Sequence, residues 1–435
     1  MSRRNLQLMI AVAVVSLVCY QKRDPFGATF VRAMQKIDQE YVEPVDRREL
    51  FEAAMTGMMG RLDDYSAYIG PRDFNDLQES LGQEFGGIGI EVFVDPENKN
   101  LTVATPLVGT PAFEAGVRAG DQILKIDDKT CAGLSVDDAR SRLRGTPGDP
   151  VRLTVLHLGD MQPTELRMNR AIIEVETVLG DSRDADNHWD FFLSGSDRIG
   201  YIRITSFGGK TADELRAAVD WLLKRKMRGL ILDLRNDPGG LLETAVAVCD
   251  MFINEGPIVS TRGRNKVQIQ TYEAHALGTF PDFPMVVLVN RYSASASEIV
   301  AACLQDHGRA TIVGERTWGK GSVQDVIPLE GGRSALKLTM ATYWRPSNKN
   351  IHRQRDAAET DEWGVMPDAG GEVKLEKEQF EKVIEDRRRR DIVRPGGRTT
   401  SEAVQPRDLD VDPQLKRGVE LLDEKISHPA VAKAA

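Results

Sequence analysis

A serine, a lysine and a glycine pair lie in three short loops of this 435-residue chain, and each loop follows an apolar run. Ser295 lies in "NRYSASASE", Lys320 in "ERTWGKGS", and Gly239 and Gly240 in "RNDPGG". A serine hydroxyl becomes a nucleophile when a base accepts its proton, and free backbone N–H groups at a glycine turn stabilise an oxyanion. If the three loops meet, these residue types could carry out nucleophilic acyl transfer.

Ser295 also fits a structural role. Glu298 follows three residues later and opens an apolar helical pattern, which is the signature of a capping box. The same position would leave free backbone N–H groups, that of Ala296 among them, at the positive end of a helix dipole. The capping role and the catalytic role are compatible.

Lys320 has two interpretations besides that of a surface lysine. The pattern G-x-x-x-x-G-K suggests a phosphate-binding loop, but Gly321 replaces the required hydroxyl, and "SVQDVIPL" predicts a strand where a long helix should start. The alternative is a general base whose pKa is lowered by burial, with Trp318 excluding water. If Gly321 permits a helical turn, the Gln324 amide would orient the lysine nitrogen. No histidine lies in these loops to act as the base.

The elements that must position these loops alternate between strand and helix. Apolar strands separated by helices predict a sheet covered on both faces, whose loops at the carboxyl ends could converge on one cleft. The expected strands span residues 198–204, 229–235, 285–290, 310–314 and 334–344, and the expected helices span residues 212–225, 239–253 and 297–308. Residues 26–83 are expected to be helical. Residues 86–170 are expected to form a small domain of short strands with a helix from Pro111 to Ala115.

Composition and charge exclude several other functions. The net charge of −9 argues against nucleic-acid binding, and the run Arg387–Arg390 is interpreted as a solvated helix face or tail. The four cysteines lack C-x-x-C spacing, so Cys131, Cys249 and Cys303 are expected to be buried free thiols. No H-x-x-x-H or H-E-x-x-H pair is present, so no zinc site is expected.

The N-terminus is expected to carry a targeting signal. Arg3 and Arg4 precede 13 uncharged apolar residues, Leu8 to Tyr20. That run is shorter than the span of about 20 residues that crosses a membrane, and it matches the apolar region of a secretory signal. We expect export to the periplasmic or extracytoplasmic side of the membrane, with the segment either cleaved or kept as an anchor. A buried N-terminal helix is the alternative.

Several motifs in order resemble one family. The stretches are "YVEPVD", "GMMGRLDDYSAYI", "FGGIGIEV", "TPAFEAGVRAGDQILKID", "LRGTPGDPVRLTV", "YIRITSFG", "LILDLRNDPGGLL", "VLVNRYSASASEIVAACLQDHGRATIVGERTWGKGSVQ" and "TYWRP…WGVMPD". They extend from about Tyr41 to Asp368 and resemble the C-terminal processing (tail-specific) serine proteases, which are exported Ser/Lys peptidases with an inserted PDZ domain.

The resemblance implies a role for each matching residue. The nucleophile falls on Ser295, the lysine base on Lys320, and the supporting amide on Gln324. The oxyanion donors fall on the backbone of Ala296 and of the glycine pair, Gly239 or Gly240. The core is expected to have the crotonase-like α/β fold of the family.

The stretch "GGIGI" resembles the carboxylate-binding loop of a PDZ domain. This implies that backbone N–H groups of Gly86, Gly87, Ile88, Gly89 and Ile90 bind a terminal carboxylate while the peptide adds as a β-strand. Substrates would then be proteins with apolar, accessible C-terminal tails. A mere spacer is the alternative role of this domain.

Two stretches depart from the family pattern. Asp237 precedes the Pro-Gly-Gly turn, where the family usually has Asn-Pro-Gly-Gly, and places an additional carboxylate near the expected site. The loop at residues 345–364 is longer and more charged than usual. Both bear on substrate range and assembly.

The expected organisation is a signal peptide or membrane anchor (1–25), an N-terminal helical region (26–83), a PDZ domain (84–172), a Ser/Lys protease core (173–374) and a charged helical tail (375–435). The expected function is that of a serine endopeptidase acting on exported proteins, without cofactor or metal. An adaptor or activator protein, the membrane and a second copy of the chain are compatible partners; nucleic acid is not. A catalytically inactive PDZ adaptor on a protease-like core is the alternative, with an acyl-CoA enzyme a distant third.

Overall fold

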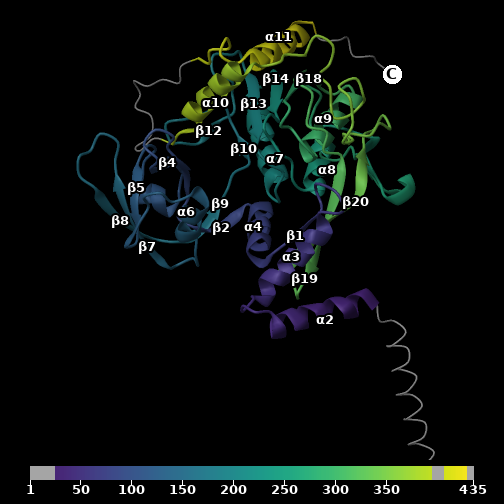
Figure 1. Cartoon of the computed structure of the whole chain (residues 1–435). Coiled ribbons are helices and arrows are strands. Elements are labelled where there is room, and N and C mark those ends of the chain that lie inside the picture. The colour runs from purple at the N-terminus through teal and green to yellow at the C-terminus, as the bar shows by residue number, and fades with distance from the viewer. Residues whose placement is uncertain (1–24, 394–405, 429–435) are drawn as a thin grey trace, which may run out of the picture. The chain divides into compact units, whose positions relative to one another are not determined.

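The computed structural model describes residues 25–393 and 406–428 (Figure 1). The expected signal segment and Cys19 lie outside these residues. Among the described residues, those up to 74 together with 324–339 form one compact unit, and the others form a second. Within the described residues, every helix is too short or too polar to span a membrane.

The first unit is built on helices and on strands that pair with β20, namely β1 and most of β19 (Ser322–Leu329). Its elements are α2 (Pro25–Glu40), α3 (Arg47–Met59) and β1 (Ala67–Ile69), which pairs antiparallel with residues 335–337 of β20 (Ser334–Trp344). The Asp46 side chain accepts the Arg48 N–H and caps α3. The helices expected from the apolar spacing are confirmed.

The PDZ region of the second unit is a small β-domain. Its six-stranded sheet has the order β3-β4-β5-β7-β8 with β6 added to β5, so β3 is an edge strand. Ile88, Val103, Ile123 and Leu153 are among the residues of its buried core. Its elements, with the preceding helix, are α4 (Pro71–Gly82), β2 (Glu84–Gly87), β3 (Ile90–Val94), β4 (Leu101–Pro106), α5 (Pro111–Glu114), β5 (Gln122–Ile126), β6 (Lys129–Thr130), α6 (Val136–Leu143), β7 (Pro150–Leu156), β8 (Thr164–Asn169) and β9 (Ala171–Glu174).

The centre of the second unit is a five-stranded sheet of order β10-β13-β14-β17-β18. β13, β14, β17 and β18 are parallel neighbours, and β10 is antiparallel to β13. The elements are β10 (Val178–Leu179), β13 (Ile199–Ile204), α7 (Thr211–Lys224), β14 (Gly229–Asp233), α8 (Leu242–Asp250), β17 (Met285–Val289), α9 (Ala296–Asp306) and β18 (Thr311–Gly314). The alternating strands and helices predicted from the sequence are confirmed.

Each face of this sheet has its own cover. Residues of α7, α8 and α9 pack in one core with strand residues such as Leu232 and Val287. On the other face, Leu415 and Leu422 of α11 (Pro413–Ser427) pack in a second core with Ile231 and Val286. Helix α11 therefore contacts β14, β17 and β18 (Figure 1), and a segment far along the chain completes the core.

The other elements form separate small sheets or single helices. β11 and β12 pair with each other, and β15 pairs with β16 and with residues 342–344 of β20. The strands β15 and β16 were not predicted. The elements are β11 (Ser182–Arg183), β12 (Trp189–Asp190), β15 (Pro257–Arg262), η1 (Arg264–Lys266), β16 (Gln268–Glu273), β19 (Ser322–Leu329) and α10 (Lys377–Asp391).

The burial of the cysteines agrees with the sequence prediction. The prediction that the arginine run is solvated does not agree with the structure. Cys131, Cys249 and Cys303 are buried and free. The run Arg387–Arg390 lies on α10, but Arg387 is only 8% exposed. Its guanidinium donates to Asp391 Oδ1 at 3.0 Å, so the expectation of a wholly solvated charged face was wrong.

Candidate active site

The three strand-end loops meet at the carboxyl ends of β14, β17 and β18. The Asn290 side chain accepts the Asn236 N–H at 3.0 Å and donates to Asn236 Oδ1 at 2.9 Å. The Asp237 carbonyl accepts the Ala294 N–H at 3.0 Å. The Trp318 N–H donates to the Ser293 carbonyl at 3.0 Å. Backbone and amide hydrogen bonds therefore join all three loops into one site.

Ser295 lies at the junction of its loop with α9. It is the N-cap of the helix, is 7% exposed, and has a φ of 56° and a ψ of −114°. A positive φ is uncommon for a residue with a side chain, and such strain is concentrated at functional sites. Ala296 is the first residue of α9, and its N–H has no hydrogen-bond acceptor among the described residues.

The glycine pair packs directly against the loop that carries Ser295. A methyl group on Gly239 would lie 2.6 Å from the Ala294 carbonyl oxygen and 2.7 Å from the Ala296 nitrogen. A methyl group on Gly240 would lie 2.2 Å from the Phe207 carbonyl oxygen. Only glycine fits at either position, because these distances are far inside van der Waals contact.

The Gly239 N–H is not free in this conformation. It donates to Asp237 Oδ1 at 2.8 Å. Asp237 is fully buried, and its Oδ2 has no hydrogen-bond partner. Burial raises the pKa of Asp237 well above its ordinary value, although the Gly239 N–H and the contact with Ser297 lower it. The additional carboxylate noticed in the sequence is thus in direct contact with the oxyanion loop.

Glu298 links the serine loop to the lysine loop. Its Oε2 accepts the Ser295 N–H at 2.9 Å and the Lys320 N–H at 2.8 Å. Its Oε1 accepts the Thr317 hydroxyl at 2.5 Å and the Gly319 N–H at 2.7 Å. Burial raises the pKa of Glu298 to about 7, and these four donors act in the opposite direction. One buried carboxylate therefore holds the backbone of both predicted catalytic residues.

The lysine loop is only partly sheltered. Lys320 is half-buried, whereas Trp318 is 50% exposed and so does not seal the site from water as expected. The loop is held from its other side by the Arg353 N–H, which donates to the Gly319 carbonyl at 2.8 Å. A methyl group on Gly321 would lie 2.3 Å from the His352 nitrogen. The long charged loop seen in the sequence thus packs on the lysine loop.

Gln324 does not follow a helical turn. Residues 322–329 form the strand β19, as the sequence pattern of this stretch predicted, so the turn that would stack Gln324 over Lys320 is absent. The Gln324 side chain donates to Thr339 Oγ1 at 3.2 Å. Its supporting role stays a prediction.

The PDZ groove lies between the edge strand β3 and α6. It has a volume of about 370 Å³. The carbonyls of Ile88 and Gly89 are hydrogen-bonded inside the domain, whereas their N–H groups have no acceptor among the described residues. The groove is lined by Phe85, Gly87, Ile88, Gly89, Ile90, Glu91, Val92, Val136, Arg140, Leu143 and Arg144. Of the predicted loop, only Gly86 does not line it; a methyl group there would lie 2.3 Å from the Gly145 carbonyl oxygen.

One cluster of possible metal ligands occurs within the described residues. Asp184, Asp186 and His188 are exposed and lie outside the site. Asp184 Oδ1 already accepts the backbone N–H groups of Asp186 and His188, each at 2.9 Å. This arrangement is an ordinary acidic turn.

Sequence reasoning missed the full role of Glu298. The capping box accounts for its position at the start of α9, and that local explanation hides the contacts with Thr317, Gly319 and Lys320, which are 19 to 22 residues away. The signal that could have revealed these contacts was a carboxylate at a position expected to be buried, because a buried carboxylate needs several hydrogen-bond donors.

Comparison with known proteins agrees with this geometry. The profile of peptidase family S41 matches residues 198–369, that of the PDZ domain residues 102–156, and that of the activating protease CtpB N-terminal domain residues 22–72. The chain is 37% identical over 426 residues to a carboxy-terminal-processing protease of Bartonella bacilliformis, covering 94% of this chain and 90% of that protein. It is 34% identical to the carboxy-terminal processing protease CtpA of Bacillus subtilis, covering 74% and 66%.

Among solved structures, a photosystem II D1 C-terminal processing protease is 29% identical, with a TM-score of 0.46, covering 84% of this chain and 97% of that one. The identity and coverage of the curated relatives establish the family resemblance seen in the sequence. With its S41 and PDZ domains, the chain belongs to the C-terminal processing proteases, a family of serine-type peptidases.

Proposed function

We propose that the chain is a serine endopeptidase in which Ser295 is the nucleophile and Lys320 the general base. The observation that supports this most strongly is the double contact of Glu298, whose Oε2 accepts both backbone N–H groups. A shared anchor fixes the two residues relative to each other, which is what proton transfer between their side chains requires.

The reaction proceeds by acyl transfer. Neutral Lys320 takes the proton of the Ser295 hydroxyl while the oxygen attacks the scissile carbonyl carbon. The oxyanion is stabilised by the Ala296 N–H and an N–H of the glycine pair. Lys320 then gives the proton to the leaving amine as the C–N bond breaks. A water activated by Lys320 hydrolyses the ester, releasing a carboxylate and restoring the hydroxyl. Gln324 supports the lysine.

The substrate class proposed is a protein with an apolar, accessible C-terminal tail. Free N–H groups at Ile88 and Gly89 suit a terminal carboxylate, and the open edge of β3 suits an added strand. Ile88, Ile90, Val92, Val136 and Leu143 give the groove an apolar lining for the last side chains.

A cleavage assay tests the proposal. The substrate is an unfolded protein with an apolar C-terminal tail, offered to the wild type, Ser295→Ala and Lys320→Ala, with folding checked by thermal unfolding. We expect cleavage by the wild type alone and unchanged folding of both variants. Undiminished cleavage by folded Lys320→Ala would refute the lysine as base. Tail binding without cleavage by any form would instead indicate a PDZ adaptor.

A further inference from the structure

Helix α10 and the central sheet enclose a cavity that is lined by arginines. The neighbouring carboxylates do not accept hydrogen bonds from all of the guanidinium N–H groups. The cavity has a volume of about 110 Å³. A water molecule needs only about 10–15 Å³ of such volume, so a small polyatomic ion has room. Its lining consists of four arginines, polar residues at the ends of three strands, one residue of α11, and apolar residues of α10 and of the segment before it: Arg203, Arg235, Arg387, Arg407, Thr205, Asp233, Asn236, Asn290, Gln414, Leu375, Phe380, Val383 and Ile384.

One of the arginines is fully satisfied. Arg235 donates to both oxygens of Asp233 and of Asp412, and its Nη1 also donates to Gln414 Oε1 at 3.1 Å. Its side chain is 6% exposed. Arg235 is therefore a structural ion pair and does not need a ligand.

The other three arginines each bury a nitrogen that has no hydrogen-bond acceptor within residues 25–393 and 406–428. These atoms are Arg203 Nε, Arg387 Nη1 and Arg407 Nε. Arg387 Nη1 lies 3.8 Å from the nearest oxygen of Asp181, and Arg407 Nε lies 3.7 Å from Asp386, both too far for a hydrogen bond. The side chains of Arg387 and Arg407 are 9% and 1% exposed. Buried charged donors without acceptors are rare because they are costly.

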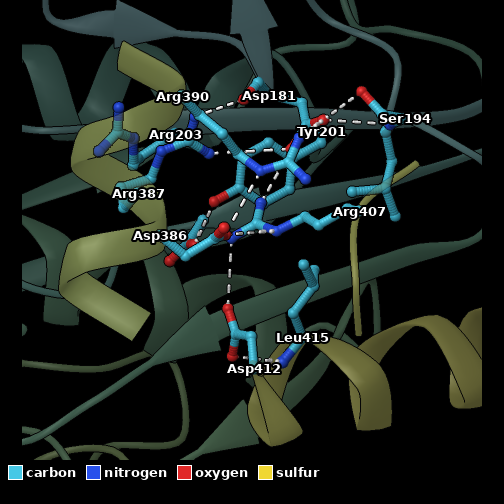
Figure 2. Close-up of polar contacts among 12 residues, drawn as sticks. Asp181, Ser194, Tyr201, Arg203, Asp386, Arg387, Arg390, Arg407, Asp412 and Leu415 are labelled. Carbon is cyan, nitrogen blue, oxygen red and sulfur yellow. Dashed lines mark hydrogen bonds and ion pairs between the residues drawn. The ribbon is translucent and has the colours of Figure 1, made fainter. Parts of the chain in front are cut away.

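The nearby carboxylates are already engaged. Asp181 accepts from Arg407, from Arg390 and from the N–H and hydroxyl of Ser194. Figure 2 shows these partners gathered around the Tyr201 ring. Asp391 accepts from both Arg203 and Arg387. Burial and the neighbouring Arg203 lower the pKa of Arg387, so the two cations repel each other across their shared carboxylate.

We propose that this cavity is a binding site for a small inorganic oxyanion such as phosphate or sulfate, held by the guanidinium groups of Arg203, Arg387 and Arg407. An oxyanion supplies several acceptor oxygens in a compact volume and offsets the repulsion between the guanidinium groups. Because the site is separate from the serine and lysine, the proposal does not depend on the peptidase mechanism.

The location of the cavity couples anion binding to the active-site loops. Asn236 and Asn290 line it and belong to the loops of the glycine pair and of Ser295. The Phe380 ring of α10 packs on the Tyr292 ring with centroids 5.6 Å apart. An anion that fixes α10 would therefore also stabilise the nucleophile loop.

The test is thermal unfolding of the full chain in a Ser295→Ala background, which prevents self-cleavage. Inorganic phosphate is titrated at constant ionic strength against chloride. We expect a saturable rise in Tm with phosphate, as ligand binding to the folded state requires, and at least tenfold weaker phosphate dependence in Arg387→Gln. The matched control is Arg389→Gln, on the exposed side of the same helix, which should respond like the parent.

Two further arms keep the test decisive. Arg203→Lys keeps the charge but removes the buried Nε–H, so it should fold and bind phosphate at least tenfold more weakly even where Arg387→Gln does not fold. In the second arm, acetate replaces phosphate to test whether a planar carboxylate binds equally well. A rise in Tm with acetate as large as that with phosphate would overturn the inorganic oxyanion as the ligand. A rise in Tm with chloride equal to that with phosphate would overturn the site itself. So would a phosphate dependence of Tm in folded Arg387→Gln or Arg203→Lys that equals that of the parent.

Discussion

At the scale of single residues, the site depends on a carboxylate that contacts no substrate. Glu298 positions Ser295 and Lys320 through their backbones and has a pKa raised to about 7. The ionised form can accept all four donors, whereas the protonated form can donate only to the Thr317 hydroxyl oxygen. We therefore expect the positions of the proposed nucleophile and base to be sensitive to pH near neutrality.

The first prediction concerns Glu298→Gln. An amide presents an NH₂ group to one pair of donors, so at least two hydrogen bonds are lost, and we expect kcat/KM to fall about 100-fold, equal to about 2.7 kcal/mol. In the wild type, kcat/KM should rise with pH through about 7 as Glu298 ionises. A pH profile of both forms measures this.

A conservative control separates positioning from simple loss of structure. Thr317→Val removes one donor to Glu298, so the rising limb should move to higher pH with a smaller loss of activity. A rising limb that is unchanged in Glu298→Gln would assign it to another group.

The second prediction concerns Gly239→Ala. The added methyl group would meet the Ala294 oxygen and the Ala296 nitrogen, and Gly239 has a φ of +93°. We expect a loss of activity of at least about 100-fold, the effect of removing an oxyanion donor. The matched control is Gly159→Ala, which has a φ of +90° and open space around it. Equal effects of both changes on peptide cleavage would mean that backbone strain, rather than crowding of the site, is responsible.

The convergence of these residues was predictable, and their fine geometry was not. The rule that reactive loops gather at the carboxyl ends of parallel strands brings Ser295, Lys320 and the glycine pair together. The donation of the Gly239 N–H to Asp237 depends on a local backbone conformation that residue types alone do not define.

At the scale of elements, α11 and α10 complete a core that the central strands begin. The apolar runs of β13, β14, β17 and β18 predicted these strands and the burial of both sheet faces. They did not predict that α11 covers one face, because the apolar side of an amphipathic helix does not specify which surface it packs against. The burial of Arg387 on α10 was not predicted for a similar reason. Its guanidinium donates to the backbone carbonyl of Asp181, which is 206 residues away in the sequence.

The third prediction concerns the docking of α11. Asp412 caps α11 by accepting the Leu415 N–H and pairs with Arg235 at 2.8 Å, with both side chains buried. Asp412→Ala should lower the free energy of unfolding by about 3–5 kcal/mol, since it leaves a buried cation with one partner fewer. Urea unfolding measures the change. Asp410→Ala, which breaks an exposed pair with Lys416, should have little effect, and a comparable loss there would contradict the role given to burial.

At the scale of the whole molecule, buried carboxylates make the free energy of unfolding depend on pH in two opposite ways. Burial would raise the pKa of Asp233, but Arg235 lowers it to about 2, and the pKa values of Asp181 and Asp412 are also lowered. The stability that these three groups contribute is present above their ordinary pKa of 3.8 and is lost as pH falls through the folded values. Glu298, with a raised pKa, contributes stability that is complete below 4.5 and lost as pH rises through about 7.

The fourth prediction follows from this opposition. Stability should be greatest at about pH 4 to 4.5 and should fall as the pH rises to about 7, whereas kcat/KM should rise with pH through about 7. Calorimetric Tm values across pH, measured beside kcat/KM, test both statements. A Tm that rises steadily from about pH 5 to 8 would contradict the assignment of Glu298 and Asp237 as groups with raised pKa values.

The order of domains along the chain was recognisable because the PDZ and protease motifs are long and occur in sequence. The expected domain boundaries remain predictions, as do the targeting role of residues 8–20 and the site roles assigned by family resemblance. Sequence patterns describe each domain separately, whereas a buried pair such as Arg235 and Asp412 joins residues 177 positions apart.

The Arg235–Asp412 pair also has a consequence for protein synthesis. A ribosome releases the chain from its N-terminus, so Ser295 and Lys320 emerge well before Asp412 and the helix that it caps. Until then, one face of the β14–β17–β18 sheet is uncovered and Arg235 lacks one of its two carboxylates. The core of a nascent chain is therefore incomplete until residues 413–427 have been synthesised.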